Sequence, residues 1–186
     1  MGCPAHVTVR VRRDVPSLRT GRFLRAFRST LRRGCERGDF RVVHYSVQGD
    51  HVHLFVEAAG KAALGRGMKS VSLRLARAAN RAFGRVGPVV LGRYHVRVLR
   101  TPREVRSALR YVLLNGRKHW RERHPRARVP EPRLDPASSG RWFDGWRRTP
   151  WPRPGPDVPE VAPARFWLST VGWRRRGRID PAEVPG

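Results

Sequence analysis

Four short stretches of this chain have the period or composition of β-strands, and their order admits few folds. Residues 6–12 alternate apolar and polar side chains, as a half-buried strand does. Residues 40–47 are rich in β-branched and aromatic side chains, and residues 51–56 follow them after the turn at residues 48–50, so the two predict a hairpin. Residues 89–99 are extended again. The predicted order is therefore a single strand, a two-stranded hairpin and a further single strand.

Helical patterns occupy the stretches between these strands. The first helix follows Ser17, which can cap it, and ends near residue 35; the second covers residues 61–83. A third helix is predicted to begin at Thr101, because a Thr cap, Pro102 and Glu104 together form a helix start signal.

The resulting order is β-α-β-β-α-β-α. This is the split βαβ order of ferredoxin-like and RRM-like α+β domains, with an antiparallel sheet and one helix added at the C-terminal side. After residue 123 the composition shifts to Pro, Trp and Arg. We therefore expect a domain over residues 1–123 and an irregular Pro/Trp/Arg-rich extension over residues 124–186 that packs on it, with a short helix near residues 164–172.

The chain carries a strong positive charge. Its 186 residues include 40 Lys and Arg against 14 Asp and Glu, a formal net charge of +26. Because such a charge repels itself in a compact fold, it is most simply explained by a polyanionic partner, and nucleic acid is the first candidate. The basic residues of the first two predicted helices that we expect near phosphates are Arg22, Arg25, Arg66, Lys69, Arg77 and Arg81.

Simple features disfavour other partners and compartments. Two cysteines, Cys3 and Cys35, are too few for a zinc cluster or a disulfide framework. No apolar run approaches the ~20 residues of a membrane span, and neither a signal-peptide core nor a lipidation motif is present. We therefore expect a cytoplasmic protein without a membrane partner.

The second strand of the hairpin contains the sequence His51-Val52-His53. On a strand, residues i and i+2 face the same side, so the two imidazoles project together. Two His at this spacing form half of a metal site. A bare His-x-His is weak support for a metal, because two polar residues on a solvated strand face give the same pattern.

Tyr111 and Asn115 lie at i and i+4 of the third predicted helix and share one of its faces. A tyrosine can be a nucleophile, and an amide oxygen can ligate a hard cation such as magnesium. Alone, the pair is also ordinary helix composition.

Taken together and in order, these features resemble a known family. The strand HVHLFVE, the long basic helix, the segment RYHVRVL and the helix with YVLLN are similar to the single-tyrosine HUH transposases, in which HUH denotes His, a bulky hydrophobic residue and His. Within that family the chain most resembles the REP-associated tyrosine transposases and their insertion-sequence relatives. The resemblance covers residues 6–120 and extends weakly into residues 138–146 and 164–177.

The resemblance implies a DNA transposase and nuclease that cleaves and rejoins single-stranded DNA at imperfect palindromes. It assigns His51, His53 and Asn115 as ligands of Mg²⁺ or Mn²⁺ and Tyr111 as the nucleophile that forms a 5′-phosphotyrosine. It is compatible with a monomer or a homodimer. Two departures from the family pattern stand beside these positions: Gly49-Asp50 replaces Pro-Asn before the first His, and Gly116-Arg117 replaces Pro-Val after the Asn.

Two other functions stay open on the residues alone. One is a non-catalytic RRM-like protein that binds single-stranded nucleic acid, but such a sheet needs exposed aromatic residues where His51 and His53 stand. The other is a small metallohydrolase, but the pattern lacks the carboxylate ligands and glutamate base that such sites usually carry.

Overall fold

A five-stranded sheet forms the centre of the computed structural model, which describes residues 2–127, 133–148 and 158–185. The strand order is β2-β3-β4-β1-β5, and every pairing is antiparallel. The strands are β1 (Pro4–Arg10), β2 (Glu36–Arg37), β3 (Phe40–Val47), β4 (His51–Ala58) and β5 (His95–Val98). The predicted α+β fold with a split βαβ order is confirmed; the two-residue β2 at the edge was not predicted.

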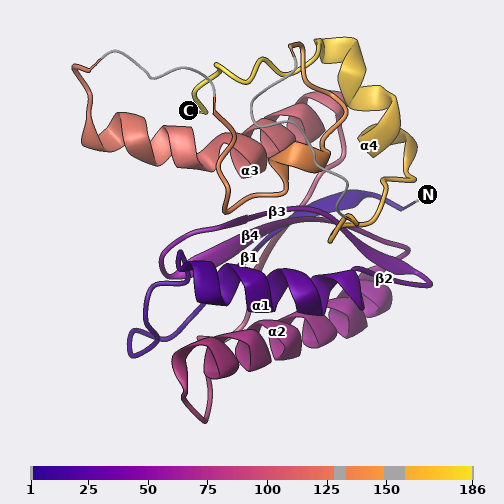
Figure 1. Cartoon of the computed structure of the whole chain (residues 1–186). Coiled ribbons are helices and arrows are strands. Elements are labelled where there is room, and N and C mark those ends of the chain that lie inside the picture. Colours follow the sequence, from indigo (N-terminus) through magenta and orange to yellow (C-terminus); the bar gives the residue numbers. More distant parts are fainter. Residues whose placement is uncertain (1, 128–132, 149–157, 186) are drawn as a thin grey trace.

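Helices cover both faces of the sheet (Figure 1). Helices α1 (Gly21–Arg32) and α2 (Lys61–Phe83) lie side by side on one face, and α3 (Pro102–Arg123) lies on the other. The alternation along β4 explains this division, because Val52 and Leu54 enter the core under α1 and α2, whereas Phe55 enters a second core under α3. The sheet face that carries His51 and His53 is therefore the face that α3 covers.

The helix starts confirm one prediction and correct another. Thr101 caps α3 by accepting a hydrogen bond from the backbone N–H of Glu104, whose side chain returns to the Thr101 backbone. This is the predicted capping box. The prediction that Ser17 caps α1 is wrong, because Thr20 is the cap and accepts from the backbone N–H of Phe23. The chain before Thr20 instead places Leu18 in the core, where it is fully buried.

A bulge in β3 changes which residues face each core. The register with β4 shifts between Val42 and His44. As a result Val42 and Tyr45 both face α1 and α2, while Val43 faces α3. All eight residues of β3 are buried, because the strand is covered on both faces.

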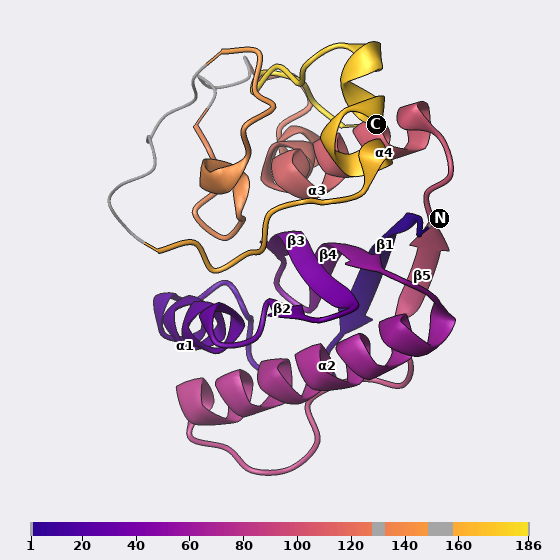
Figure 2. The ribbon, with the colours of Figure 1, turned by 90° about the vertical axis from the view of Figure 1, so that its right-hand side faces the viewer.

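The described parts of the C-terminal extension pack on the α3 side of the sheet (Figure 2). They contain the short helices η1 (Gly140–Trp142), α4 (Trp167–Thr170) and η2 (Gly172–Arg176), and the last two correspond to the short helix predicted near residues 164–172. Backbone hydrogen bonds join the extension to β3, from Val47 to Ala137, from Ser139 to Tyr45 and from Ala162 to Val42. Residues 128–132 and 149–157 of the predicted extension lie outside the described residues.

Two buried carboxylates fasten this extension to the domain. Glu57, at the end of β4, accepts hydrogen bonds from the backbone N–H groups of Arg165 and Phe166 and pairs with Arg41 at 2.9 Å. Glu160, on the extension, accepts from the hydroxyl of Tyr45 at 2.6 Å. Burial alone would raise the pKa of Glu160, but hydrogen bonds from Tyr45 and Trp142 outweigh it and leave that pKa lowered.

Candidate active site

The two histidines of β4 meet on the sheet face beneath α3. The Nε2 atoms of His51 and His53 lie 3.0 Å apart. The Nδ1 atom of His51 lies 2.6 Å from a carboxylate oxygen of Asp50, which precedes it in the turn. The carboxylate orients the His51 ring, and the predicted same-side projection of the two imidazoles is confirmed.

Two residues of β1 contact His53 from the neighbouring strand. The Nδ1 atom of His53 lies 3.1 Å from the Nε2 atom of His6 and 3.1 Å from the hydroxyl oxygen of Thr8. Thr8 stands directly opposite His53 in the antiparallel register. Burial, followed by the charges of His51 and His6, lowers the pKa of His53 to about 3, and burial lowers that of His6 to about 4. Both rings are therefore neutral near pH 7, the form in which imidazole binds metals.

Helix α3 brings Tyr111 to the same place. The Tyr111 ring centroid lies 5.1 Å from that of His53 and 5.6 Å from that of His6. The ammonium group of Lys118, two turns further along α3, lies 5.0 Å from the centroid of the Tyr111 ring. A cation over an aromatic face is attracted by the ring's electron density and more strongly by a phenolate.

Asn115 follows Tyr111 by about one turn and is fully buried in α3. Neither its amide nitrogen nor its amide oxygen has a hydrogen-bond partner. The helix is kinked just before it, because Leu114 has non-helical angles (φ −112°, ψ 15°). A buried amide without a hydrogen-bond partner is uncommon in folded proteins. It is consistent with a side chain that binds a cation or substrate. That the amide joins the two imidazoles at one point stays a prediction.

No cluster of three His, Cys, Asp or Glu side chains suited to a metal occurs among residues 2–127, 133–148 and 158–185. A cation held by His51 and His53 would therefore need its further ligands from the Asn115 amide, from DNA or from water.

Two surface hollows flank the centre formed by His53 and Tyr111. The first, about 340 Å³, is lined on one side by Asp50 and His51 and on the other by residues of the second half of α3, among them His119. The second, about 310 Å³, is lined by His6 and Tyr111 and by residues of β5 and the chain terminus. A larger cavity of about 520 Å³ lies between the extension and β3 and contains none of the predicted site residues.

Comparison with known proteins gives the family of the chain. A family model described as IS200-like transposase matches residues 1–94, just over half of the 186 residues. The chain belongs to the IS200-like transposase family. The matched segment of this transposase contains both histidines and ends before α3, which carries Tyr111 and Asn115.

Two solved structures are similar to this transposase. One is a REP-associated tyrosine transposase bound to a REP hairpin, with 19% identity and a TM-score of 0.48 over 63% of this chain and 68% of that chain. The other is a protein from Deinococcus radiodurans R1 assigned as a transposase, with 18% identity and a TM-score of 0.44 over 54% of this chain and 81% of that chain. A search of curated proteins found no match.

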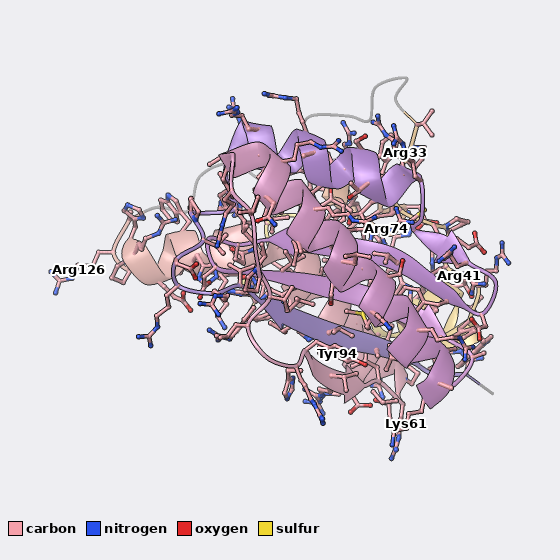
Figure 3. The ribbon with its side chains drawn as sticks, turned by 90° about the horizontal axis from the view of Figure 1, so that it is seen from below. Arg33, Arg41, Lys61, Arg74, Tyr94 and Arg126 are labelled. Carbon is pink, nitrogen blue, oxygen red and sulfur yellow. The ribbon has the colours of Figure 1, made fainter. Side chains whose placement is uncertain are left out.

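The predicted phosphate-binding residues lie on the opposite side of the transposase from this centre. All six are exposed on α1 or α2. Figure 3 views that face, with Arg74 between the two helices and Lys61 at the start of α2. Arg66 is paired with Asp39 at 2.6 Å. The sheet separates this basic face from the histidines, so a straight DNA strand cannot contact both. The assignment of the six residues to phosphate binding stays a prediction.

Several residues that line the transposase's centre were not predicted from the sequence, chiefly His6, Thr8 and Lys118. The signal for the first two was present, because the split βαβ order places β1 beside β4 and His6 and Thr8 share the polar parity of β1. Lys118 is at i+7 from Tyr111 and could have been found from helical spacing.

No described helix of the transposase is long and apolar enough to span a bilayer.

Proposed function

We propose that this transposase cleaves and rejoins single-stranded DNA at hairpin sequences through a 5′-phosphotyrosine formed on Tyr111. A divalent cation, Mg²⁺ or Mn²⁺, is held by His51, His53 and Asn115. The observation that carries the proposal is the meeting, within one chain, of a tyrosine ring with a strand-borne histidine pair, 5.1 Å from the nearer imidazole.

The spacing of the two histidine nitrogens is short enough for both to bind one cation. The Nε2 atoms of His51 and His53 are 3.0 Å apart. The Nδ1 atom of His51 faces a carboxylate oxygen of Asp50, and the Nδ1 atom of His53 faces the Nε2 atom of His6 and the hydroxyl oxygen of Thr8. A proton on each Nδ1 leaves both Nε2 lone pairs available for the cation, the usual arrangement of metal-binding histidines.

The chemistry follows from the nucleophile. The phenol oxygen of Tyr111 loses its proton and attacks the scissile phosphorus, while the bond from phosphorus to the 3′ oxygen breaks and that oxygen takes a proton. The product is a 5′-phosphotyrosine and a free 3′-OH. A bound divalent cation stabilises the negative charge that develops on the phosphoryl oxygens. Because one phosphodiester replaces another, a second 3′-OH can reverse the step without an external energy source.

The two hollows give the substrate strand a path. One opens beside His51 and the other beside His6 and Tyr111, so a strand running from one to the other passes the tyrosine. Basic residues line both hollows, Arg19 and Arg123 in the first and Arg97 and Arg110 in the second. Phosphate contacts by arginine are charge-assisted and often bidentate. We assign Arg22, Arg25, Arg66, Lys69, Arg77 and Arg81 to DNA outside this path, on the α1 and α2 face.

The test uses radiolabelled hairpin oligonucleotides with single-stranded flanks, the full chain and a denaturing gel. We expect a covalent protein–DNA adduct with Mg²⁺ or Mn²⁺ and none in EDTA or on the fully duplex oligonucleotide. The variant in which His51 and His53 are both replaced by Ala should form no adduct in any metal. Undiminished adduct formation in EDTA would overturn the metal assignment.

A further inference from the structure

His6 on β1 contacts both His53 and Tyr111 of the proposed centre. Its Nε2 atom lies 3.1 Å from the Nδ1 atom of His53, and its ring centroid lies 5.6 Å from that of Tyr111. We propose that His6 is a positioning residue, which fixes the tautomer and direction of the His53 ring and holds the Tyr111 ring beside it. The inference rests on the proposed function and assigns a role to a residue outside the proposed ligand set.

The hydrogen bond between the two imidazoles has a defined direction if His53 is a ligand. The Nε2 atom of His53 faces that of His51, so its proton must stand on Nδ1. The Nδ1–H group then donates to the Nε2 lone pair of His6, whose own proton is on Nδ1. This is the position that a carboxylate or carbonyl oxygen usually occupies behind a metal-binding histidine.

Thr8 competes for the same proton. Its hydroxyl oxygen is also 3.1 Å from the Nδ1 atom of His53. A hydroxyl can donate as well as accept, so alone it holds either tautomer of His53. In its Nδ1–H tautomer, His6 presents only a lone pair at Nε2 and therefore accepts a hydrogen bond from the Nδ1–H group of His53. The assignment of the orienting role to His6 and not to Thr8 is thus open to direct test.

The ring of His6 also contacts the nucleophile. Tyr111 is packed between His53 and His6, with interplanar angles of 80° and 58°. His6 is partly buried in β1 and cannot follow a movement of α3, because its strand is paired on both sides, with β4 and β5. A shift of His6 therefore displaces the ligand and the nucleophile together.

The test separates these roles with four single variants of the full chain. His6→Phe keeps a ring against Tyr111 and removes the acceptor; His6→Gln restores an acceptor oxygen. Thr8→Val removes the competing hydroxyl, and His124→Phe, at the exposed end of α3, is the matched control. Mn²⁺ affinity is measured by electron paramagnetic resonance. We expect a roughly tenfold or greater loss for His6→Phe, a return towards wild type for His6→Gln, and wild-type affinity for the control.

A second measurement needs no metal. The ring nitrogen chemical shifts of His53, recorded by NMR on ¹⁵N-histidine-labelled protein, report its tautomer. We expect a predominantly Nδ1–H ring in the wild type and in Thr8→Val, and a mixture in His6→Phe.

Each outcome bears on a different claim. Wild-type tautomer and Mn²⁺ affinity in His6→Phe would overturn the role of His6 and leave the proposed function standing. Loss in Thr8→Val but not in His6→Phe would do the same and name Thr8 as the orienting residue. Mn²⁺ binding that survives replacement of both His51 and His53 by Ala would instead overturn the proposed metal site, and with it the inference.

Discussion

The ring centroids of Tyr111 and His53 lie 5.1 Å apart, with the rings nearly perpendicular at 80°. The two residues come from α3 and β4 of a single chain. Tyr111 and the histidine pair therefore meet without a second copy, although the sequence was compatible with a homodimer that exchanges α3. The first prediction follows from this arrangement.

Active sites assembled within one chain cannot be restored by mixing defective chains. A mixture of Tyr111→Phe protein with protein in which His53 is replaced by Ala should form no more adduct than either alone. The measurement is adduct formation on a labelled hairpin oligonucleotide, after the two proteins are unfolded and refolded together. Recovery to about a quarter or more of the wild-type yield would show that α3 acts on the partner's histidines.

The separation between the basic helices and the centre leads to the second prediction. Replacing Arg77 and Arg81 by Ala should weaken DNA binding and reduce the slope of log affinity against log salt by about 0.7 for each single-strand phosphate that the protein no longer neutralises. The rate of adduct formation at saturating protein should not change, because α2, which carries the two residues, lies across the sheet from α3, which carries Tyr111 (Figure 1). Binding titrations at several NaCl concentrations give the slope. An unchanged slope would mean that Arg77 and Arg81 contact no DNA phosphates.

The third prediction concerns the attachment of the extension. Glu57→Ala removes the nearer of the two carboxylate partners of buried Arg41, the other being Glu36, and leaves two backbone N–H groups without an acceptor. Breaking a buried pair from one side costs ~3–5 kcal/mol of unfolding free energy. The matched control is Asp39→Ala, which breaks the exposed pair with Arg66 and should cost ~1 kcal/mol or less. Urea denaturation measures both. Equal costs would show that Glu57 does not fasten the extension.

The fourth prediction concerns pH. Burial lowers the pKa of His44 to about 4, well below its ordinary value of 6.5, and its ring contacts Ser139 of the extension at 3.2 Å. Between these two pH values the unfolded chain binds the proton and the folded chain does not. The stability is therefore fully present above pH ~6.5 and is lost as the pH falls towards 4, by up to ~1.4 kcal/mol per pH unit for each such histidine.

His6 and His53 act in the same direction, because burial lowers the pKa of both. Replacing His44 by Gln should make the fall in unfolding free energy between pH 6.5 and pH 4.5 shallower than in the wild type. A series of denaturation curves over that range provides the comparison. If the two proteins have parallel pH profiles, His44 is not a neutral buried residue in the fold.

Much of the fold was predictable because it depends on local patterns. The alternation at His51 to His53 fixed a strand and the side on which the imidazoles lie, and Thr101 with Glu104 fixed the start of α3. These features are short-range, so the residues themselves specify them. The choice of Thr20 over Ser17 as a cap is different, because either hydroxyl can cap and the burial of Leu18 decides between them.

The features that escaped prediction depend on contacts between distant segments. The bulge at Val42 and His44 has no mark in the sequence, since β3 is covered on both faces and lacks a clean alternation. The kink at Leu114 likewise interrupts a regular helical pattern. His6 lies at the centre only because β1 pairs with β4. Predicting it from the sequence requires both the strand order and the register between these two strands.

The proposed function depends above all on Tyr111 as the nucleophile. Phe at this position keeps the ring that packs on His53 and His6 and removes only the oxygen. If Tyr111 is merely structural, its loss removes at most one hydrogen bond, about 1 kcal/mol, and leaves cleavage intact. Tyr94→Phe, on the segment before β5, is the matched control.

The decisive measurement is a denaturing gel of wild type, Tyr111→Phe and Tyr94→Phe after incubation with a hairpin oligonucleotide labelled on the 5′-phosphate side of the cut. We expect a covalent adduct for wild type and Tyr94→Phe, and none for Tyr111→Phe despite DNA affinity close to wild type. An adduct formed by Tyr111→Phe at the wild-type level would show that another residue is the nucleophile.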